Sequence, residues 1–324
     1  MRNLTTLIHI DNNHIDTKVI DISFPQSHII INPIHLTFKD LKSLDKDINN
    51  LPLTLDIKDA TITLSDFRAF APILKKFQHP VYLTIKAEGT INDFIIEKLH
   101  IRSENEWLTM NCSASIKHPL QREIAEIYAP DLQMNVVTTN LAKVLVEEGL
   151  INQKIADRIS TIRYMGIDGN LNYAAKKADY RGTIATGIGK LITDGTFRLN
   201  DKGSSFAGCL RTDNLQLGKF LANNNIGDIA FDIDTDMLIS GGKPKGIVKG
   251  VVNKAVLKGY EYHDITADLS IDNNSYEGLI TLKDDNADIE ISGMAVLDKK
   301  NTKIEVEAHT SGMRLHQLNL IKKW

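Results

Sequence analysis

Three aspartates, Asp232, Asp234 and Asp236, alternate with apolar residues in the segment from Phe231 to Met237. Side chains two positions apart on a β-strand point to the same face. The three carboxylates would therefore share a face and could bind Ca²⁺, which prefers oxygen ligands. The segment lacks the glycine turn and the distal glutamate that complete a calcium-binding loop. We therefore interpret the aspartates as a solvent-facing stripe.

Two other short motifs resemble catalytic or phosphate-binding signatures only in part. Gly187-Ile188-Gly189-Lys190 lacks the spacing of a phosphate-binding loop and its following Ser or Thr, which indicates a simple turn. Ser204-Ser205 lies outside the Gly-x-Ser-x-Gly context of a nucleophilic serine. Neither motif predicts an enzyme.

Acidic residues in turn regions form two further pairs. A glycosidase needs two carboxylates on opposite sides of a cleft. Asp272 with Glu277, or Asp284 with Asp285, could act in this way only if folding placed them across such a cleft. Acids of this kind are usually solvated loop residues. The sequence therefore favours a non-enzymatic chain with no cofactor.

The two cysteines, Cys112 and Cys209, lie in strand-like segments 97 residues apart. They form no metal-ligand spacing with the ten histidines. We expect both to be small buried residues, and we expect no metal site.

Charge and hydropathy exclude two classes of function. The chain has 324 residues, with 38 Lys and Arg against 41 Asp and Glu, and no basic cluster is interleaved with aromatic residues, which argues against a nucleic-acid surface. No apolar run approaches the roughly 18 residues that a membrane-spanning helix requires.

Alternation of apolar and polar residues is the dominant structural signal, and it predicts strands with one apolar and one polar face. Turn signals at Asp272-Asn273-Asn274, at residues 200–203 and at residues 241–244 separate these strands at hairpin spacing, which favours an antiparallel meander. The positions that we expect to line one apolar face are Leu55, Ile57, Leu83, Ile85, Phe231, Ile233, Leu269, Ile271, Ile289, Ile291, Ile304 and Val306.

Helical signals are few. We expect a helix over residues 120–128 that ends at Pro130, a helix over residues 140–162 that is capped by Thr139 or Asn140 and broken at Gly149, and a short helix over residues 66–76 that is interrupted by Pro72. These elements are too short to cover the apolar face of so many strands. The sheet must therefore either fold onto itself as a sandwich or curl and leave an apolar trough.

A short phrase returns four times along the chain, at residues 62–67, 132–136, 215–220 and 313–318. In each copy a strand ends in an apolar-polar-apolar step and a short helical segment follows. An offset of 98 residues places Gly195 on Gly293 and Leu217 on Leu315, whereas the second and third copies align at an offset of 83. Such a repeat indicates stacked supersecondary units, which we place at residues 1–80, 81–165, 166–240 and 241–324.

The repeat resembles the periplasmic repeat region of the TamB and AsmA-like proteins. The resemblance rests on Ile62-Thr63-Leu64-Ser65-Asp66-Phe67 with Ala71-Pro72, on residues 83–85, 88–93 and 98–101, and on a further copy over residues 210–297 that includes Leu215-Gln216-Leu217-Gly218-Lys219-Phe220. The chain lacks the N-terminal anchor helix and the C-terminal module of that family, so we expect it to be a fragment of a longer protein.

The resemblance implies a mainly β fold, in which a long antiparallel meander sheet curls into a U-shaped apolar trough and carries a few short helices. It implies a non-enzymatic protein of the cell envelope, located in the periplasm and anchored in the inner membrane by parts outside this chain. Its expected partners are phospholipid or another acyl-chain ligand and an outer-membrane barrel. The expected role is phospholipid transport between the two membranes, assistance to outer-membrane protein assembly, or both.

Two alternatives remain at this stage. The first is a closed β-sandwich repeat that acts as a scaffold or adhesin, and the second is a polysaccharide-active β-helix enzyme. A β-helix repeats every 20–30 residues or so, whereas the units here run from 70 to 98 residues. The enzyme therefore ranks last.

Overall fold

The computed structural model describes residues 2–40, 42, 48–69, 72–121, 123–200, 203–298 and 302–321. Strands hold 64% of the chain and helices 12%, so the fold is mainly β, as the alternation predicts. The chain divides into two compact units, Met1–Ala175 and Lys176–Trp324. The four repeat boundaries expected from the sequence remain a prediction.

Unit 1 contains nine strands of an antiparallel meander and a small sheet of three strands, β2-β3-β6. Its strands are β1 (Asn3–Thr5), β2 (Ile8–Ile10), β3 (His14–Thr17), β4 (Ile20–Ser23), β5 (His28–Ile31), β6 (His35–Thr37), β7 (Leu53–Ile62), β8 (Val81–Gly89), β9 (Asp93–Ser103), β10 (Leu108–Lys117), β11 (Glu126–Val137) and β12 (Tyr164–Ala174). Its helices are the 3₁₀ turns η1 (Ile48–Asn50), η2 (Leu64–Phe67), η3 (Pro72–Lys76) and η4 (Glu104–Glu106), and the α-helices α2 (Thr138–Glu147) and α3 (Gln153–Thr161).

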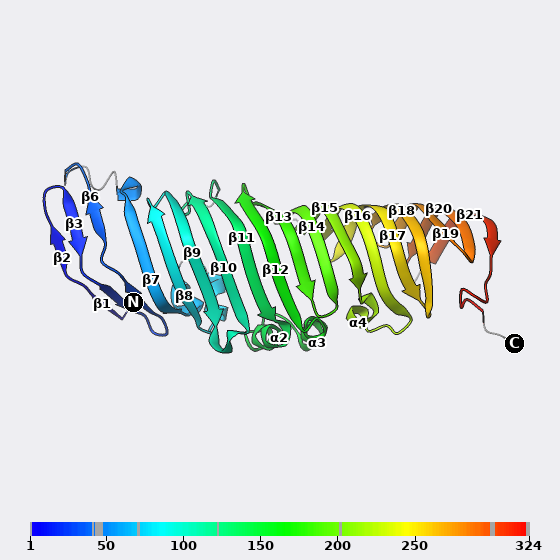
Figure 1. Ribbon diagram of the computed structural model, residues 1–324, viewed down its shortest axis with the longest axis horizontal. Coiled ribbons are helices and arrows are strands. Elements are labelled where there is room, and N and C mark those ends of the chain that lie inside the picture. Colours follow the sequence, from blue (N-terminus) through cyan, green and yellow to red (C-terminus); the bar gives the residue numbers. More distant parts are fainter. Residues whose placement is uncertain are drawn as a thin grey trace. The chain divides into compact units, whose positions relative to one another are not determined.

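Unit 2 contains nine further strands, which pair antiparallel in chain order (Figure 1). They are β13 (Lys177–Thr186), β14 (Gly189–Asn200), β15 (Gly203–Leu215), β16 (Ile226–Ser240), β17 (Lys243–Leu257), β18 (Tyr260–Asp272), β19 (Ser275–Asp284), β20 (Ala287–Leu297) and β21 (Thr302–Met313), with the short helix α4 (Leu217–Leu221) after β15. The predicted turns at residues 241–242 and 273–274 are hairpin tips. In the predicted turn at residues 200–203, Asp201 and Lys202 lie outside the described residues.

The four copies of the repeated phrase mark the ends of β7, β11, β15 and β21. Each end leads into a helix or a series of turns, namely η2, α2, α4 and residues 315–319. From β7 to β11 and from β11 to β15 the chain adds four strands each time, whereas from β15 to β21 it adds six. The last offset is the longest because two more strands are inserted there, whereas the first two offsets differ although each step adds four strands.

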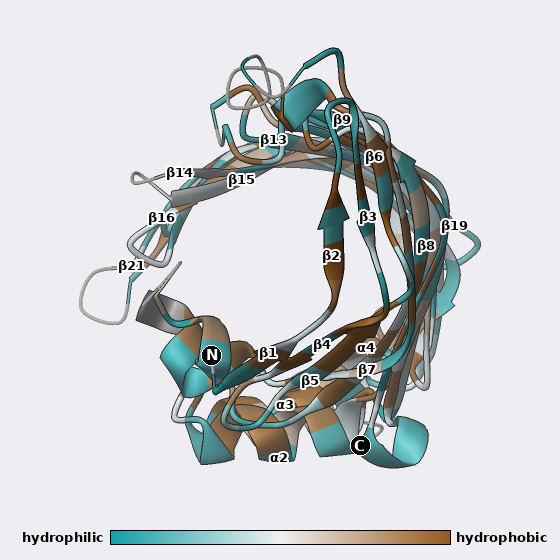
Figure 2. Cartoon of the chain, turned by 90° about the vertical axis from the view of Figure 1, so that its left-hand side faces the viewer, coloured by the Kyte–Doolittle hydropathy of each residue, from teal (hydrophilic) through white to brown (hydrophobic). Residues whose placement is uncertain are grey.

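Bulges bend the strands of unit 1. The register shifts between Ile57 and Ala60 in β7 and between Ala129 and Leu132 in β11, which leaves extra residues in both strands. A bulge bends its strand and increases the local twist. Asp131 accepts hydrogen bonds from the backbone N–H of Ser113 at 2.7 Å and from its hydroxyl at 2.8 Å, so it satisfies a donor that the bulge removes from the ladder. Figure 2 shows that the strands curve.

Glycines allow close approach of neighbouring strands in unit 2. Gly278 and Gly293 lie opposite each other in β19 and β20 and adopt φ values of +146° and +135°. A Cβ atom at Gly278 would lie 2.0 Å from the carbonyl oxygen of Asp268, and one at Gly293 would lie 2.3 Å from that of Glu305. Such mid-strand glycines are a known source of sheet curvature. Curling of the sheet thus depends on residues that lack a side chain.

The helix expected over residues 140–162 is confirmed as the pair α2 and α3, with Gly149 at φ +66° after α2. The expected cap is wrong, because α2 begins at Thr138 without a side-chain cap. Helix α3 is capped by Asn152, whose side chain accepts from the N–H of Ile155 at 3.0 Å. The helix pair lies at the edge where β8 starts, since Glu148 Oε1 accepts from the N–H of Gln78 at 3.0 Å.

The helix expected over residues 120–128 is wrong. Its last three residues belong to β11, where Ile127 lies opposite Tyr173 of β12, and Leu120 and Ile124 before the strand are exposed. Strand pairing outweighs the helical spacing of these apolar residues, and Pro130 lies within the strand at its bulge, where no N–H is required. The segment 66–76 forms parts of η2 and η3, while Phe70 and Ala71 lie outside the described residues.

The segment after β21 packs onto one end of the apolar face of unit 2. Leu318 is 1% exposed and contacts a cluster that includes Tyr262 and Ala287. The hydroxyl of Tyr262 donates to the carbonyl of Leu318 at 3.2 Å, and Asn319 donates to the carbonyl of Lys258 at 3.0 Å. This segment therefore packs against the first residues of β18 and β20 and stabilises them.

Replacing the buried Leu318 by alanine should lower the free energy of unfolding by about 2–5 kcal/mol, because it leaves a cavity under an otherwise covered site. Chemical denaturation of the chain measures the change. Leu320→Ala is the matched control, since Leu320 is 45% exposed and its truncation should cost no more than about 0.5 kcal/mol. Equal losses for the two variants would contradict this account of the segment.

Gly293→Ala should destabilise the chain by about 1–3 kcal/mol, because the added methyl group meets a carbonyl oxygen and the backbone conformation is unfavourable for alanine. Gly312→Ala in β21 is the control, because a Cβ atom there meets no atom within 4 Å. Denaturation midpoints of the two variants provide the comparison. A Gly293→Ala variant as stable as the Gly312→Ala variant would show that β20 and β21 do not approach closely at this point.

Candidate functional site

The four groove positions expected in unit 1 lie on one face of its sheet. Ile57 of β7 lies opposite Ile85 of β8, and Leu55 lies opposite Ala87. Leu83 lies two residues before Ile85 and so shares its face. The apolar face continues through β9 to β12, where the packed residues are Phe94, Ile96, Leu99, Cys112, Ala114, Ile116, Ala129, Leu132 and Leu171.

The eight positions expected in unit 2 also share one face. A row of directly opposed residues runs from Ile233 through Gly250, Ala267 and Ile280 to Ile291. A second row joins Ile271, Tyr276, Ala295 and Ile304. Phe231, Leu269, Ile289 and Val306 fall on the same face, because each lies two residues from a member of these rows.

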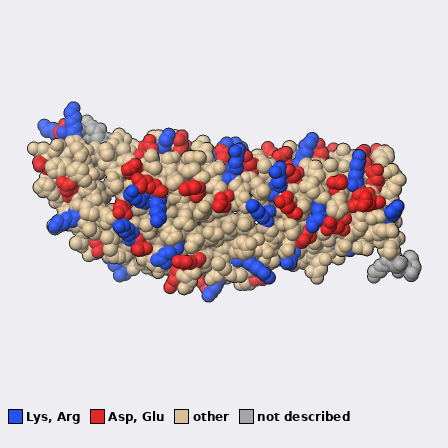
Figure 3. Space-filling model, viewed as in Figure 1, with Lys and Arg blue, Asp and Glu red and all other residues tan. Residues whose placement is uncertain are grey.

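The opposite face of each unit is mainly polar, although the exposed residues Ile95, Ile247 and Leu279 also lie on it. In unit 2, neighbouring strands are joined across this face by ion pairs between Lys249 and Asp268 at 2.7 Å and between Lys245 and Asp272 at 2.8 Å. In unit 1 Lys86 pairs with Glu97 in the same manner. Figure 3 shows charges of both signs interspersed over the visible surface. Such exposed pairs contribute little stability, but they keep this face hydrated.

The apolar faces are incompletely covered. In unit 1 the expected groove position Ile57 is buried, as is Ile96, together with small side chains such as Ala87. In unit 2, Ile291 is 37% exposed and Val306 48% exposed. Among the described residues, the helices and the segment around Leu318 cover the ends of the strands rather than the length of the face. Large aliphatic side chains therefore contact one another along the sheet and remain accessible from above.

A hollow of about 250 Å³ opens on the apolar face of unit 1. Its apolar lining comes from the β7 start and the β8–β9 turn, with Leu53, Leu55, Ala87, Ile91, Phe94 and Pro119. Pockets that enclose a drug-sized molecule span roughly 300–1,000 Å³. This hollow is smaller and suits the end of an aliphatic chain.

The acidic candidates lie outside these apolar faces. Asp232, Asp234 and Asp236 lie on the polar face of β16, and the Arg211 guanidinium contacts Asp232 at 2.5 Å. Asp284 sits at the β19–β20 turn, where it accepts hydrogen bonds from the Tyr260 hydroxyl and from the N–H of Asn286 and His263. Burial alone would raise the pKa of Asp284, but these hydrogen bonds outweigh it and lower the pKa. The bonds tie Asp284 into the turn.

The other candidate motifs have structural positions. Residues 187–188 form the turn between β13 and β14, as expected, and Ser204 and Ser205 lie within β15. The expectation for the cysteines is wrong in degree, because Cys112 and Cys209 are free thiols that are only partly buried. Desolvation raises the pKa of the Cys112 thiol. Cys112 packs against the apolar cluster of unit 1 but stays partly accessible.

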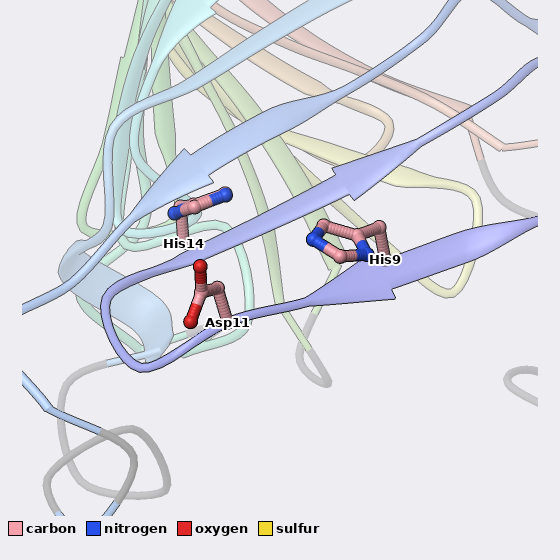
Figure 4. A group of neighbouring side chains, drawn as sticks. All are labelled: His9, Asp11 and His14. Atoms are coloured by element: carbon pink, nitrogen blue, oxygen red, sulfur yellow. The ribbon is translucent and has the colours of Figure 1, made fainter.

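Sequence reasoning missed one group of potential metal ligands. His9, Asp11 and His14 each present a ligand atom within 4.8 Å of the others, on the hairpin that joins β2 and β3 (Figure 4). The signal was the spacing His-x-Asp-x-x-His across the polar turn Asp11-Asn12-Asn13. A hairpin brings such residues together, whereas their separation along the chain matches no common metal motif.

A second carboxylate lies behind this group. Asp16 of β3 is 2.5 Å from Nδ1 of His35 and 3.4 Å from Nε2 of His14. The hydrogen bond with His35 is the largest influence on Asp16 and lowers its pKa. Three histidines and two aspartates therefore meet on the small sheet β2-β3-β6.

Among the described residues, no helix combines the length and apolar content needed to cross a membrane. Comparison of the chain with protein-family models, curated proteins and solved structures finds no match.

Proposed function

We propose that this chain is a non-enzymatic segment of a cell-envelope protein that holds the acyl chains of phospholipids on its apolar faces. The observation that carries the proposal is the incompletely covered apolar face, most open in unit 2, where Ile291 and Val306 are more than a third exposed. Contiguous apolar surface that stays exposed in a folded protein marks an interaction or ligand site. The resemblance to TamB and AsmA-like proteins supports the same conclusion.

Acyl chains match the chemistry of these faces. Each methylene group that leaves water contributes about 0.8 kcal/mol, and the faces offer aliphatic side chains with few polar groups. The hollow beside Leu55 and Phe94 would receive the end of a chain. The lipid head group would remain at the hydrated rim, where it meets water and the charged residues of the strand ends.

Equivalent positions on successive strands favour movement of the ligand over tight capture. In unit 2 the row from Ile233 to Ile291 runs over five neighbouring strands without a polar side chain, with isoleucine at three positions and the small residues Gly250 and Ala267 between them. A lipid that shifts by one strand exchanges one set of contacts for a similar set. This favours phospholipid transport as the role, and the resemblance to TamB and AsmA-like proteins supports transport between the inner and outer membranes, with the chain in the periplasm.

Assistance to outer-membrane protein assembly is the second candidate role. Strand β21 is exposed along its whole length, from Thr302 to Met313, and among the described residues it pairs in register with β20 on one side. A strand with an unpaired edge can accept another strand by β-augmentation. An exposed edge suits a partner that contributes a β-strand, and the resemblance to TamB and AsmA-like proteins supports an outer-membrane barrel as that partner.

Two alternatives have less support. A closed β-sandwich would pack two apolar faces against each other, whereas Ile291 and Val306 on the apolar face of unit 2 remain exposed. A polysaccharide-active enzyme would need paired acids in a cleft, whereas Asp272 pairs with Lys245 and Asp284 is bonded within its turn.

The chain purified without detergent should carry phospholipid. Solvent extraction followed by mass spectrometry identifies the lipid, and native mass spectrometry reports how many molecules each chain holds.

A charged side chain introduced on the apolar face should weaken phospholipid binding. Ile291→Arg or Val306→Arg should weaken the binding of a fluorescent phospholipid about tenfold or more, since an unpaired charge among acyl chains costs several kcal/mol.

The matched controls are Glu290→Arg and Glu305→Arg, because each places the same side chain one residue away on the polar face. They should bind lipid as the unchanged chain does. Both Ile291 and Val306 are already partly solvated, so the variants should fold, and circular dichroism verifies this. Equal effects on the two faces, or a chain that is free of lipid and does not bind it, would overturn the proposal.

A further inference from the structure

The hairpin β2–β3 positions His9, Asp11 and His14 by ordinary strand geometry. His9 and Asp11 lie two residues apart and so project from the same side of the hairpin, and the N–H of Asp11 donates to the carbonyl of His14 at 3.0 Å across the turn. Oδ1 of Asp11 accepts from the N–H of Asn12 at 2.7 Å, which orients the carboxylate. Figure 4 shows the three side chains on one side of the hairpin.

The ligand atoms are nearly close enough to share one ion. Zinc–nitrogen and zinc–oxygen bonds of about 2.0–2.2 Å place two ligand atoms within roughly 4.4 Å of each other. The atoms of His9, Asp11 and His14 lie within 4.8 Å. His9 and Asp11 are exposed, so small rotations of their side chains close the difference.

A supporting shell is already in place. Metal-bound histidines generally donate their second ring N–H to a carboxylate, which fixes the ring and increases its basicity. Asp16 lies on the Nε2 side of His14, at 3.4 Å, and its other carboxylate oxygen contacts Nδ1 of His35 at 2.5 Å. The metal-binding atom of His14 is then Nδ1, and the ion would replace the contact of Nδ1 with Oδ1 of Asn13 at 3.1 Å. The exposed pair of His28 and Asp21, at 2.9 Å, contains the same residue types but belongs to no such group of three ligands among the described residues.

We propose that His9, Asp11 and His14 bind a divalent first-row transition metal ion of the Zn²⁺ class. Two imidazoles and one carboxylate suit Zn²⁺, whereas Ca²⁺ and Mg²⁺ prefer oxygen ligands alone. Water would complete the coordination, since the site faces solvent. The proposal does not depend on lipid binding, because the site lies on the small sheet β2-β3-β6.

The metal ion would stabilise the position of strand β2, which few other contacts hold. Strand β2 has three residues, and Leu7, Ile8 and Ile10 are each more than half exposed, so apolar burial contributes little to its position. A metal bridge from His9 to His14 links β2 directly to β3. Metal binding should therefore stabilise the β2–β3 hairpin.

The test uses the chain without a histidine tag and with Zn²⁺ as the probe. Isothermal titration calorimetry should give one Zn²⁺ per chain, and elemental analysis after dialysis should agree. His9→Ala, His14→Ala and Asp11→Asn should each weaken binding at least tenfold. His28→Ala and Asp21→Asn are the matched controls and should leave both affinity and stoichiometry unchanged.

Asp16→Asn tests the supporting carboxylate. It should weaken binding by about 10–100-fold while the stoichiometry stays at one ion, and the visible spectrum of the Co²⁺-loaded chain should shift because the His14 ring is held differently. Circular dichroism confirms that Asp11→Asn, which preserves the side-chain shape, leaves the fold intact. A chain that binds no Zn²⁺, or ligand variants that bind as tightly as the two controls, would overturn the site.

Discussion

Antiparallel pairing in a fixed register is the interaction on which this structure depends. Because successive side chains on a strand alternate between faces, a shift of one residue in any pairing would move every aliphatic side chain of that strand into the polar face. The row from Ile233 to Ile291 exists because each of four successive strand pairings places residues of the apolar face opposite each other. The same register places Lys249 opposite Asp268 and Lys245 opposite Asp272 on the other face, where they form ion pairs.

Curvature is the second requirement, and it comes from local exceptions to the regular ladder. The bulges in β7 and β11 bend unit 1, and the opposed glycines Gly278 and Gly293 allow close strand approach in unit 2. A flat sheet would leave its apolar face fully open to water. A curled sheet brings its aliphatic side chains nearer to one another, so that they are partly covered and yet remain reachable by a ligand.

The metal-ligand group and the apolar faces illustrate two different ways of building a site. The apolar faces arise from many similar residues, so no single position is decisive and the chemistry is that of an extended surface. His9, Asp11 and His14 form a small site in which each donor atom matters. The first kind of site follows from a periodic pattern, whereas the second depends on where one hairpin turns.

The sequence by itself determined the fold class and the assignment of residues to faces, because period-two alternation is a local property of the chain. It predicted the shared faces of Leu55 with Ile57 and of Ile289 with Ile291, the break at Gly149 and the hairpin at residues 241–242. It failed at residues 120–128, where pairing of Ile127 with Tyr173 outweighs helical spacing. Only the tertiary structure revealed the bulges, the burial of Leu318 and the meeting of His9, Asp11 and His14, since each depends on contacts between residues whose register or turn geometry no local pattern specifies.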